Sequence, residues 1–295
     1  MENTRTKTTR NSLILLLTAA IWGMAFVSQS KGMDYMHPFT FNGVRSLIGA
    51  ASILVYILIS RKIAGDKAAP LDWKLNVKAG LLCGIFLTIA STLQQFGIKY
   101  TSVGKAGFIT TLYIIFVPMF GIFLKKKVAP VVWAAAVMAA VGMYLLCMTE
   151  SLHLGAGDIM VFLCAIAFAI QIMTVDHYAA RIDGAVVSCI QFTVCGVVCC
   201  IGALIWGQPT FGQLQEGLGA LLYAGVLSCG VGYTLQIVGQ KGLNPTVAAL
   251  IMSLESVIAT ISGWIAYKIG FLTTDQTLTA RQIAGCVIVF AAVGV

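Results

Sequence analysis

A glutamate stands in the middle of a long apolar run near the carboxyl end of the chain. Glu255 lies in the sequence Ser253-Leu254-Glu255-Ser256, inside an apolar segment that covers residues 244–267. An acidic side chain at the centre of a membrane helix costs about 3 kcal/mol on insertion scales, so it is kept where it faces a bundle interior or a water-filled cavity. The position therefore predicts a functional carboxyl group, which carries a proton or pairs with a cationic group, in preference to a glutamate buried only for helix packing.

Two further polar side chains in apolar runs are candidates for the same site. Tyr113 lies in the middle of the segment 102–124 and offers a ring for stacking and a hydroxyl for hydrogen bonding. Arg45 lies eight residues into the segment 38–60, with Asn42 one helical turn before it. The arginine would bind an anionic group of a substrate, pair with a carboxylate such as that of the glutamate above, or extend toward the membrane surface. For this residue a structural or gating role is favoured over direct binding.

The third apolar run, residues 75–98, carries an unusual number of polar side chains. Four of them have the i, i+3, i+4, i+7 spacing that places side chains on one face of a helix. They are Thr88, Ser91, Thr92 and Gln95. That face is expected to point inward, toward a neighbouring helix or a wet cavity. The remaining candidates are two amides that would donate hydrogen bonds and three aromatic side chains that would form walls. They are Gln171, Gln191, Trp22, Tyr233 and Trp264.

The motifs of enzymes, metal sites and cofactor sites are missing from the chain. It contains no HExxH, no P-loop GxxxxGK[ST], no GxSxG and no complete Rossmann fingerprint. Its nine cysteines form no CxxC pair, and the histidines that would complete a zinc site with them are absent. We therefore expect no cofactor and no metal, with the cysteines packing as small apolar side chains. The lack of a P-loop also argues against direct coupling to ATP.

The composition is that of a membrane protein. Of the 295 residues, 59% are hydrophobic and only 10% are charged, and the mean hydropathy is +0.91. A soluble domain carries about 25% charged residues because its surface faces water, whereas a surface that faces lipid needs none. The net charge is +8, but the basic residues lie between the apolar runs, as topology signals do, rather than on one solvated face. We therefore expect a lipid bilayer around the chain and no binding to nucleic acid.

Ten apolar runs follow one another along the chain, each near the length of about 20 residues that a helix needs to cross a bilayer. The predicted spans are residues 11–30, 38–60, 75–98, 102–124, 128–148, 157–175, 184–206, 217–238, 244–267 and 279–295. The fold class that follows is an all-α membrane protein with about ten transmembrane helices and short connections. The basic start of the chain leads into the first span with no clear cleavage site, so we expect this span to be retained.

The distribution of Lys and Arg predicts the orientation. With the N-terminus inside, thirteen of the nineteen basic residues fall in inner segments and four in outer segments. The inner group includes the cluster Lys125, Lys126 and Lys127. Positive residues accumulate on the cytoplasmic side of membrane proteins. We therefore expect a multi-pass protein of the cell inner (plasma) membrane with both termini in the cytoplasm.

The chain also repeats itself. Near the start of each half, a shift of 146 residues places Trp22 on Phe168 and Arg45 on Gln191. Further along, a shift of 142 residues matches Gln94 with Gln236, Gly97 with Gly239, Lys99 with Lys241, Ala106 with Ala248, Leu112 with Leu254, and Tyr113 with Glu255. Residues 1–149 and 150–295 are then two repeats of five spans each, and an odd number of spans forces the second copy to insert upside down. Inverted repeats are typical of secondary transporters, whose binding site lies near the midplane between the halves.

Short motifs in both halves resemble those of a known family. They are Trp22-Gly23 in the first span, Pro38 to Arg45 in the second, Lys99-Tyr100-Thr101-Ser102 leading to Thr111-Leu112-Tyr113, and Ser253-Leu254-Glu255 in the corresponding span of the second half. In their order and recurrence, the whole chain resembles EamA-type members of the drug/metabolite transporter superfamily. The resemblance implies ten helices in two inverted five-helix repeats, and transport of metabolites by alternating access.

The sequence thus predicts a secondary-active transporter of small polar metabolites, amino acids or related compounds, with export as the favoured direction. The rival hypothesis is a membrane-embedded enzyme that modifies lipids, but it needs a nucleophile, an acid and a base together at one membrane face, and none is found. A scaffold without transport activity would leave Glu255 unexplained. The expected partners are a small-molecule substrate, the lipid bilayer and, where Glu255 titrates, a coupling proton; no oligomeric state is predicted.

Overall fold

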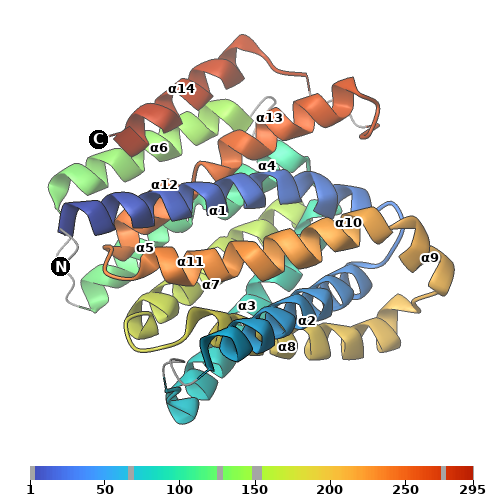
Figure 1. The fold of residues 1–295 in the computed structure, drawn as a ribbon. Coiled ribbons are helices and arrows are strands. Elements are labelled where there is room, and N and C mark those ends of the chain that lie inside the picture. The colour runs from blue at the N-terminus through green and yellow to red at the C-terminus, as the bar shows by residue number, and fades with distance from the viewer. Residues whose placement is uncertain (1–3, 66–69, 125–128, 148–154, 274–276, 295) are drawn as a thin grey trace.

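The computed structural model describes residues 4–65, 70–124, 129–147, 155–273 and 277–294, and within these ranges the regular structure is helical throughout (Figure 1). The first half contains α1 (Thr4–Gly32), α2 (Pro38–Ala64), α3 (Trp73–Ile98), α4 (Val103–Thr111), α5 (Tyr113–Phe123) and α6 (Pro130–Cys147). The second half contains α7 (Ala156–Tyr178), α8 (Gly184–Gly202), α9 (Phe211–Glu216), α10 (Leu218–Leu222), α11 (Tyr233–Gln240), α12 (Pro245–Met252), α13 (Glu255–Lys268) and α14 (Ala280–Gly294).

The helices have the length and composition of membrane spans. Eight helical stretches in the described part of the chain are long and apolar enough to cross a bilayer, and two shorter apolar helices, Pro130–Leu145 and Ala280–Val293, complete the set. The prediction of an all-α membrane protein with about ten transmembrane helices is thereby confirmed, and most predicted ends lie close to the observed ones. The cluster Lys125–Lys127, which contributes to the predicted orientation, lies outside the described residues.

Two of the predicted spans contain a tightened helical turn in the middle, which we call a break. The fourth span consists of α4 and α5, which meet at Leu112, and the ninth consists of α12 and α13, which are separated by Ser253 and Leu254. At each break the backbone stays in the right-handed helical region, and an N–H group bonds to the carbonyl three residues earlier instead of four. The two breaks fall at equivalent places of the repeat, directly before Tyr113 and Glu255.

A matched pair of side-chain hydrogen bonds accompanies the breaks. The Thr111 hydroxyl donates to the carbonyl of Phe108 at 2.9 Å, and the Ser253 hydroxyl donates to the carbonyl of Leu250 at 2.7 Å. These two hydrogen bonds are related by the 142-residue shift. A Ser or Thr side chain that bonds back to the preceding turn competes with the backbone ladder and bends a helix. The runs 102–124 and 244–267 were each predicted as one span, and hydropathy does not register a tightened turn within a run.

The two halves pack against each other reciprocally. The second helices of the halves, α2 and α8, lie together on one side of the bundle, and the fifth helices, α6 and α14, lie together on the other (Figure 1). The third helix of each half packs against the first helix of the other, as α3 does against α7 and α11 against α1. Such an exchange of partners is the pattern of a two-fold relation between the halves. With five spans in each half, the repeats are inverted in the membrane.

Candidate functional site

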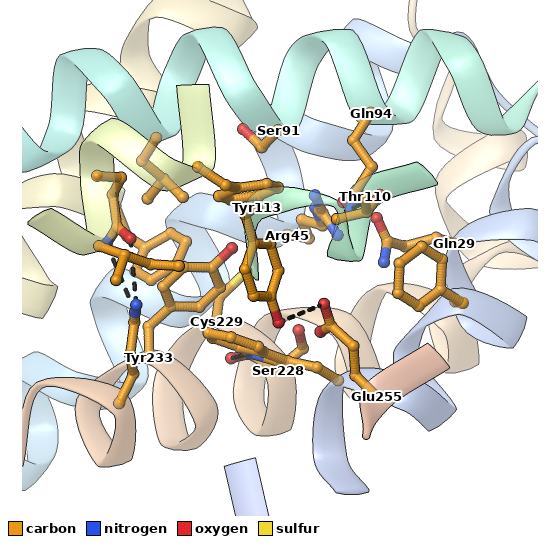
Figure 2. Close-up of a pocket in the computed structure, with 18 residues that line it drawn as sticks. Gln29, Arg45, Ser91, Gln94, Thr110, Tyr113, Ser228, Cys229, Tyr233 and Glu255 are labelled. Carbon is orange, nitrogen blue, oxygen red and sulfur yellow. Dashed lines mark hydrogen bonds between the residues drawn. The ribbon is translucent and has the colours of Figure 1, made fainter. Parts of the chain in front are cut away.

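A small cavity lies between the two halves of the bundle, and we call it the central cavity (Figure 2). Each half contributes nine of the residues that line it. The volume open to water molecules is about 30 Å³, and because one water needs about 10–15 Å³ by this measure, the cavity has room for about two. The cavity is lined by buried polar, aromatic and aliphatic side chains, and the space within it is too small for a metabolite.

Glu255 and Tyr113 meet in this cavity. The Tyr113 hydroxyl donates a hydrogen bond to Glu255 Oε1 at 3.1 Å, and the two side chains are 2% and 3% exposed respectively (Figure 2). The pair joins the two positions that the 142-residue shift matches. Tyr113 is the first residue of α5 and Glu255 is the first residue of α13. Both side chains therefore project from the residue that directly follows a break.

Arg45 lines the same cavity but does not form an ion pair with Glu255 in the part of the chain that the structure describes. Its side chain is 5% exposed, so it does not extend to the membrane surface. The Arg45 Nε donates to Asn42 Oδ1 at 3.0 Å, and the guanidinium lies over the Phe41 ring at 5.5 Å. Of the alternatives that the sequence left open, the internal pair with Glu255 and the extension to the surface are therefore not what the structure contains.

Aromatic side chains form one wall of the cavity. Trp22 and Tyr233 lie with ring centroids 4.5 Å apart, and Phe192 packs edge-on against Tyr233 at 5.0 Å. The Trp22 Nε1 donates to the carbonyl of Ser228 at 3.4 Å. That carbonyl belongs to a π-helical segment, Tyr223–Gly232, between α10 and α11. π-helical insertions occur frequently at functional sites, and hydropathy alone does not reveal this one.

Amide side chains form another part of the wall. Gln171 Nε2 lies 3.5 Å from the Oε1 atoms of both Gln191 and Gln236, and Gln236 Nε2 donates to Gln171 Oε1 at 3.2 Å. Gln94, which the repeat matches with Gln236, donates to the Thr110 hydroxyl at 3.2 Å. The two matched glutamines both line the cavity. Both halves therefore supply an amide from the same point of their third helix.

The structure brings six of the eleven predicted site residues to the central cavity. They are Glu255, Tyr113, Arg45, Trp22, Gln171 and Tyr233. The other five do not line it, although Gln191 reaches it through Gln171. They are Thr88, Thr92, Gln95, Gln191 and Trp264. A binding role for any of the eleven residues stays a prediction.

The predicted polar face of α3 is rotated relative to the cavity. Thr88 bonds back to the carbonyl of Gly84 at 2.6 Å, and Thr92 lies 3.4 Å from Cys199 Sγ. Gln95 Nε2 donates to the carbonyl of Gln29 at 3.2 Å. The side chains of α3 that line the cavity are instead Leu87, Ser91 and Gln94.

Several residues that line the cavity were not among the predicted site residues. They are Phe26, Gln29, Leu87, Gln94, Thr110, Phe168, Ile172, Phe192, Ser228, Cys229 and Gln236; Ser91 was placed on the polar face of its span but not among the site residues. The repeat contained a signal for some of them, because it matched Gln94 with Gln236 and Trp22 with Phe168. Within the described residues, no group of three or more His, Cys, Asp or Glu side chains is arranged to hold a metal ion.

Comparisons with known proteins agree with this architecture. A model of the EamA-like transporter family matches the chain twice, over residues 10–148 and 155–295. An uncharacterized transporter from Archaeoglobus fulgidus is 30% identical over 171 residues, which cover 56% of this chain and 48% of that protein. An uncharacterized transporter from Clostridium kluyveri is 23% identical over 96% of this chain and 90% of that protein. The uncharacterized transporter YwfM from Bacillus subtilis is 26% identical over 85% of this chain and 84% of that protein.

A solved structure, described in the words "Crystal structure of protein", has the same fold. The match covers 97% of this chain and 96% of that one, with a TM-score of 0.73. The two sequences are 16% identical, so the likeness concerns the fold alone. The two family matches confirm the resemblance that the motifs predicted.

Proposed function

This protein belongs to the EamA-like transporter family, and on that premise we propose that it is a secondary-active carrier that exports small polar metabolites, amino acids or related compounds, by alternating access. The observation that carries the proposal is the pair of ionisable side chains in the central cavity. Glu255 and Arg45 line one cavity and form no ion pair with each other there. Buried charges need partners, and a substrate with a cationic and an anionic group would satisfy both.

Glu255 has two roles in this proposal, and both follow from the cost of burying a charge. A carboxylate in a closed, lipid-surrounded cavity requires a counter-charge, and a proton or a substrate amine provides it before the carrier reorients. The Tyr113 hydroxyl supports the carboxylate at 3.1 Å but brings no charge. Transport would therefore depend on pH where the proton competes with the substrate for this site.

Alternating access would use the two broken spans. The breaks lie beside Tyr113 and Glu255, so the half-helices on either side can tilt while the hydrogen-bonded centre stays in place. The closed cavity, with room for about two waters, fits an intermediate in which neither side is open. We assign residues 1–149 and 150–295 to the two repeats that rock against each other.

The proposed setting is the cell inner membrane, with both termini in the cytoplasm. The excess of Lys and Arg in the segments assigned to the inside supports this orientation. The absence of a P-loop in the sequence supports energy coupling to a gradient rather than to ATP. Outward transport of a metabolite would use the proton gradient across the same membrane.

The proposal is tested in proteoliposomes with a broad panel of amino acids and related metabolites. Counterflow of at least one compound is expected, and turnover of a lipid without any counterflow would favour the membrane-embedded enzyme and end the transporter proposal. In Glu255→Gln, the shape and the hydrogen bond from Tyr113 are kept but the charge is lost. We expect normal expression with loss of pH-dependent or cation-dependent transport.

Glu216→Gln is the matched control for this variant. Glu216 is an exposed residue at the end of α9, so the same change of charge there should leave transport unaltered. If Glu255→Gln transports at the wild-type rate with the same pH profile, the carboxylate contributes to packing only and the assignment fails.

A further inference from the structure

The guanidinium of Arg45 is buried with most of its donors unused. Arginine has five N–H donors, and in the described part of the chain Arg45 makes one hydrogen bond, from Nε to Asn42. The side chain is 5% exposed and lines the central cavity. Its outer end, with the four N–H bonds of the two Nη atoms, is therefore directed at the cavity without a protein acceptor. A buried cation whose N–H donors lack acceptors would be stabilised by an anionic ligand.

Asn42 is the residue that fixes how Arg45 presents this end. Its side chain is 1% exposed, and its Nδ2 lies 3.1 Å from Ser91 Oγ, 3.2 Å from Cys199 Sγ and 3.4 Å from Thr92 Oγ1. These partners come from α3 and α8 and accept from the amide nitrogen. The amide oxygen is thereby directed at Arg45 Nε, 3.0 Å away. The orientation of an amide is assigned from such a network, and here the Arg45 Nε, which can only donate, requires the amide oxygen on its side.

The chemistry of the exposed end selects the kind of anion. The Nη1 and Nη2 groups of arginine form a planar fork that matches the two oxygens of a carboxylate. A doubly charged phosphate is a poorer fit, because the carboxyl group of Glu255 also lines the cavity and, when ionised, would repel two negative charges more strongly than one. A carboxylate is planar and carries one negative charge, so it fits the fork of Arg45 and is repelled less by Glu255.

We propose that Asn42 is a positioning residue, which holds the Arg45 guanidinium so that its two Nη atoms clamp the carboxylate of the substrate. The inference rests on the proposed transport function, since it concerns the same cavity. It goes further by assigning the anionic end of the substrate and a residue that touches only Arg45 and the network behind it. Its consequence is a preference for a carboxylic acid over the corresponding carboxamide.

Thermal stabilisation of the purified full-length protein tests this inference without a transport assay. The probes are the twenty standard amino acids and, one by one, their carboxamides, which keep the ammonium group but lack the carboxylate. We expect at least one acid to stabilise the wild type with an apparent affinity about tenfold or more above that of its amide, the scale of a hydrogen bond to a charged group. If no acid stabilises the protein, or if acid and amide act equally, the carboxylate clamp is overturned.

Two variants at position 42 test the positioning role. Asn42→Leu removes the acceptor of Arg45 Nε, and we expect the acid-to-amide ratio to fall toward one. Asn42→Asp keeps the acceptor and the size but places a carboxylate on the guanidinium, so this variant is expected to fold and to lose the preference for acids as well. Retention of the wild-type ratio in both variants would overturn the role of Asn42.

Asn76→Leu provides the control for loss of a buried amide. Asn76 is 1% exposed, and it bonds to the carbonyl of Asp72 at 2.8 Å and to the amide of Asp183 at 2.9 Å, at the start of α3. This variant should lose stability without ligand while it keeps the wild-type acid-to-amide ratio. If the proteoliposomes transport a compound but acids and their amides stabilise the protein equally, the proposed function stands and only the carboxylate clamp is refuted.

Discussion

Gly23 of α1 lies where an added methyl group would push α1 away from the start of α13. A Cβ at this position would lie 2.6 Å from Ile258 Cβ and 2.7 Å from the backbone oxygen of Glu255. Real Cβ atoms essentially never approach other atoms below 3.0 Å, and the oxygen belongs to the backbone, so it cannot turn away. Gly23→Ala must therefore separate the two helices at the residue that carries the proposed site.

The magnitude follows from two opposing effects. Overpacking of a well-packed contact costs about 1–3 kcal/mol, and replacing a helical glycine by alanine recovers about 0.5–1 kcal/mol. We expect a net loss of about 1–2 kcal/mol in the free energy of unfolding, which lowers the melting temperature by about 2–8 °C. Because Glu255 moves with its own backbone, its hydrogen bond from Tyr113 should lengthen beyond 3.1 Å and transport should fall more than stability does.

The assay is thermal unfolding in detergent together with counterflow in proteoliposomes. Gly104→Ala on α4 is the matched control, because a Cβ there meets only the Thr260 hydroxyl, at 3.5 Å. The control should be neutral or slightly stabilised. If Gly23→Ala is as stable and as active as Gly104→Ala, the contact between α1 and α13 is not tight and the reasoning is refuted.

Three shorter predictions concern the ends of the helices. Asp158 is buried and lies 2.6 Å from the Lys105 ammonium, so Asp158→Asn should lower the free energy of unfolding by about 2 kcal/mol. Asp34→Asn removes the carboxylate of an exposed pair and should lower it by less than about 1 kcal/mol. Equal losses of stability in thermal unfolding would contradict this prediction. Burial lowers the pKa of His37, whose Nδ1 caps α2, below its ordinary value of 6.5. The stability that the neutral ring contributes is present above that value and is lost as the pH falls through the lowered pKa, so His37→Asn should reduce the loss of melting temperature between pH 7 and pH 5. A cysteine replacing the exposed Lys62 on a cysteine-free background should react with an impermeant reagent in inverted vesicles only. Labelling from outside intact cells would show that the predicted orientation is wrong.

Much of the fold was predictable because the membrane imposes a simple rule. Each apolar run of sufficient length had to become a helix, since lipid offers no partner for unpaired backbone groups. The breaks at Leu112 and Leu254 and the π-helical segment Tyr223–Gly232 were not predictable by that rule. They are changes in the backbone hydrogen-bond ladder, such as the bond from the Leu254 N–H to the Ile251 carbonyl, and they do not change the hydropathy of the run.

The site was predictable where a residue type is costly in lipid, and less so where only spacing was available. Glu255 and Arg45 were predicted because an ionisable side chain in lipid has a high free-energy cost, and both line the central cavity. The polar face of α3 was selected by spacing, and only Ser91 of that face lines the cavity. Helical periodicity gives the angles between side chains of one helix, but the packing of neighbouring helices decides which of those angles points inward.

The contact between Tyr113 and Glu255 shows how a repeated chain can build an asymmetric site. Equivalent positions of two repeats face each other when they lie near the axis that relates the halves, and here the two side chains are 3.1 Å apart. Two carboxyl groups at that distance would repel each other or share a proton, and two tyrosines would bring no charge. One tyrosine and one glutamate instead form a donor and an acceptor, so the contact holds the two breaks together while one negative charge remains for a ligand. If the proposed function holds, the departure from exact repetition at this pair would let a nearly symmetric scaffold bind a substrate in a single orientation.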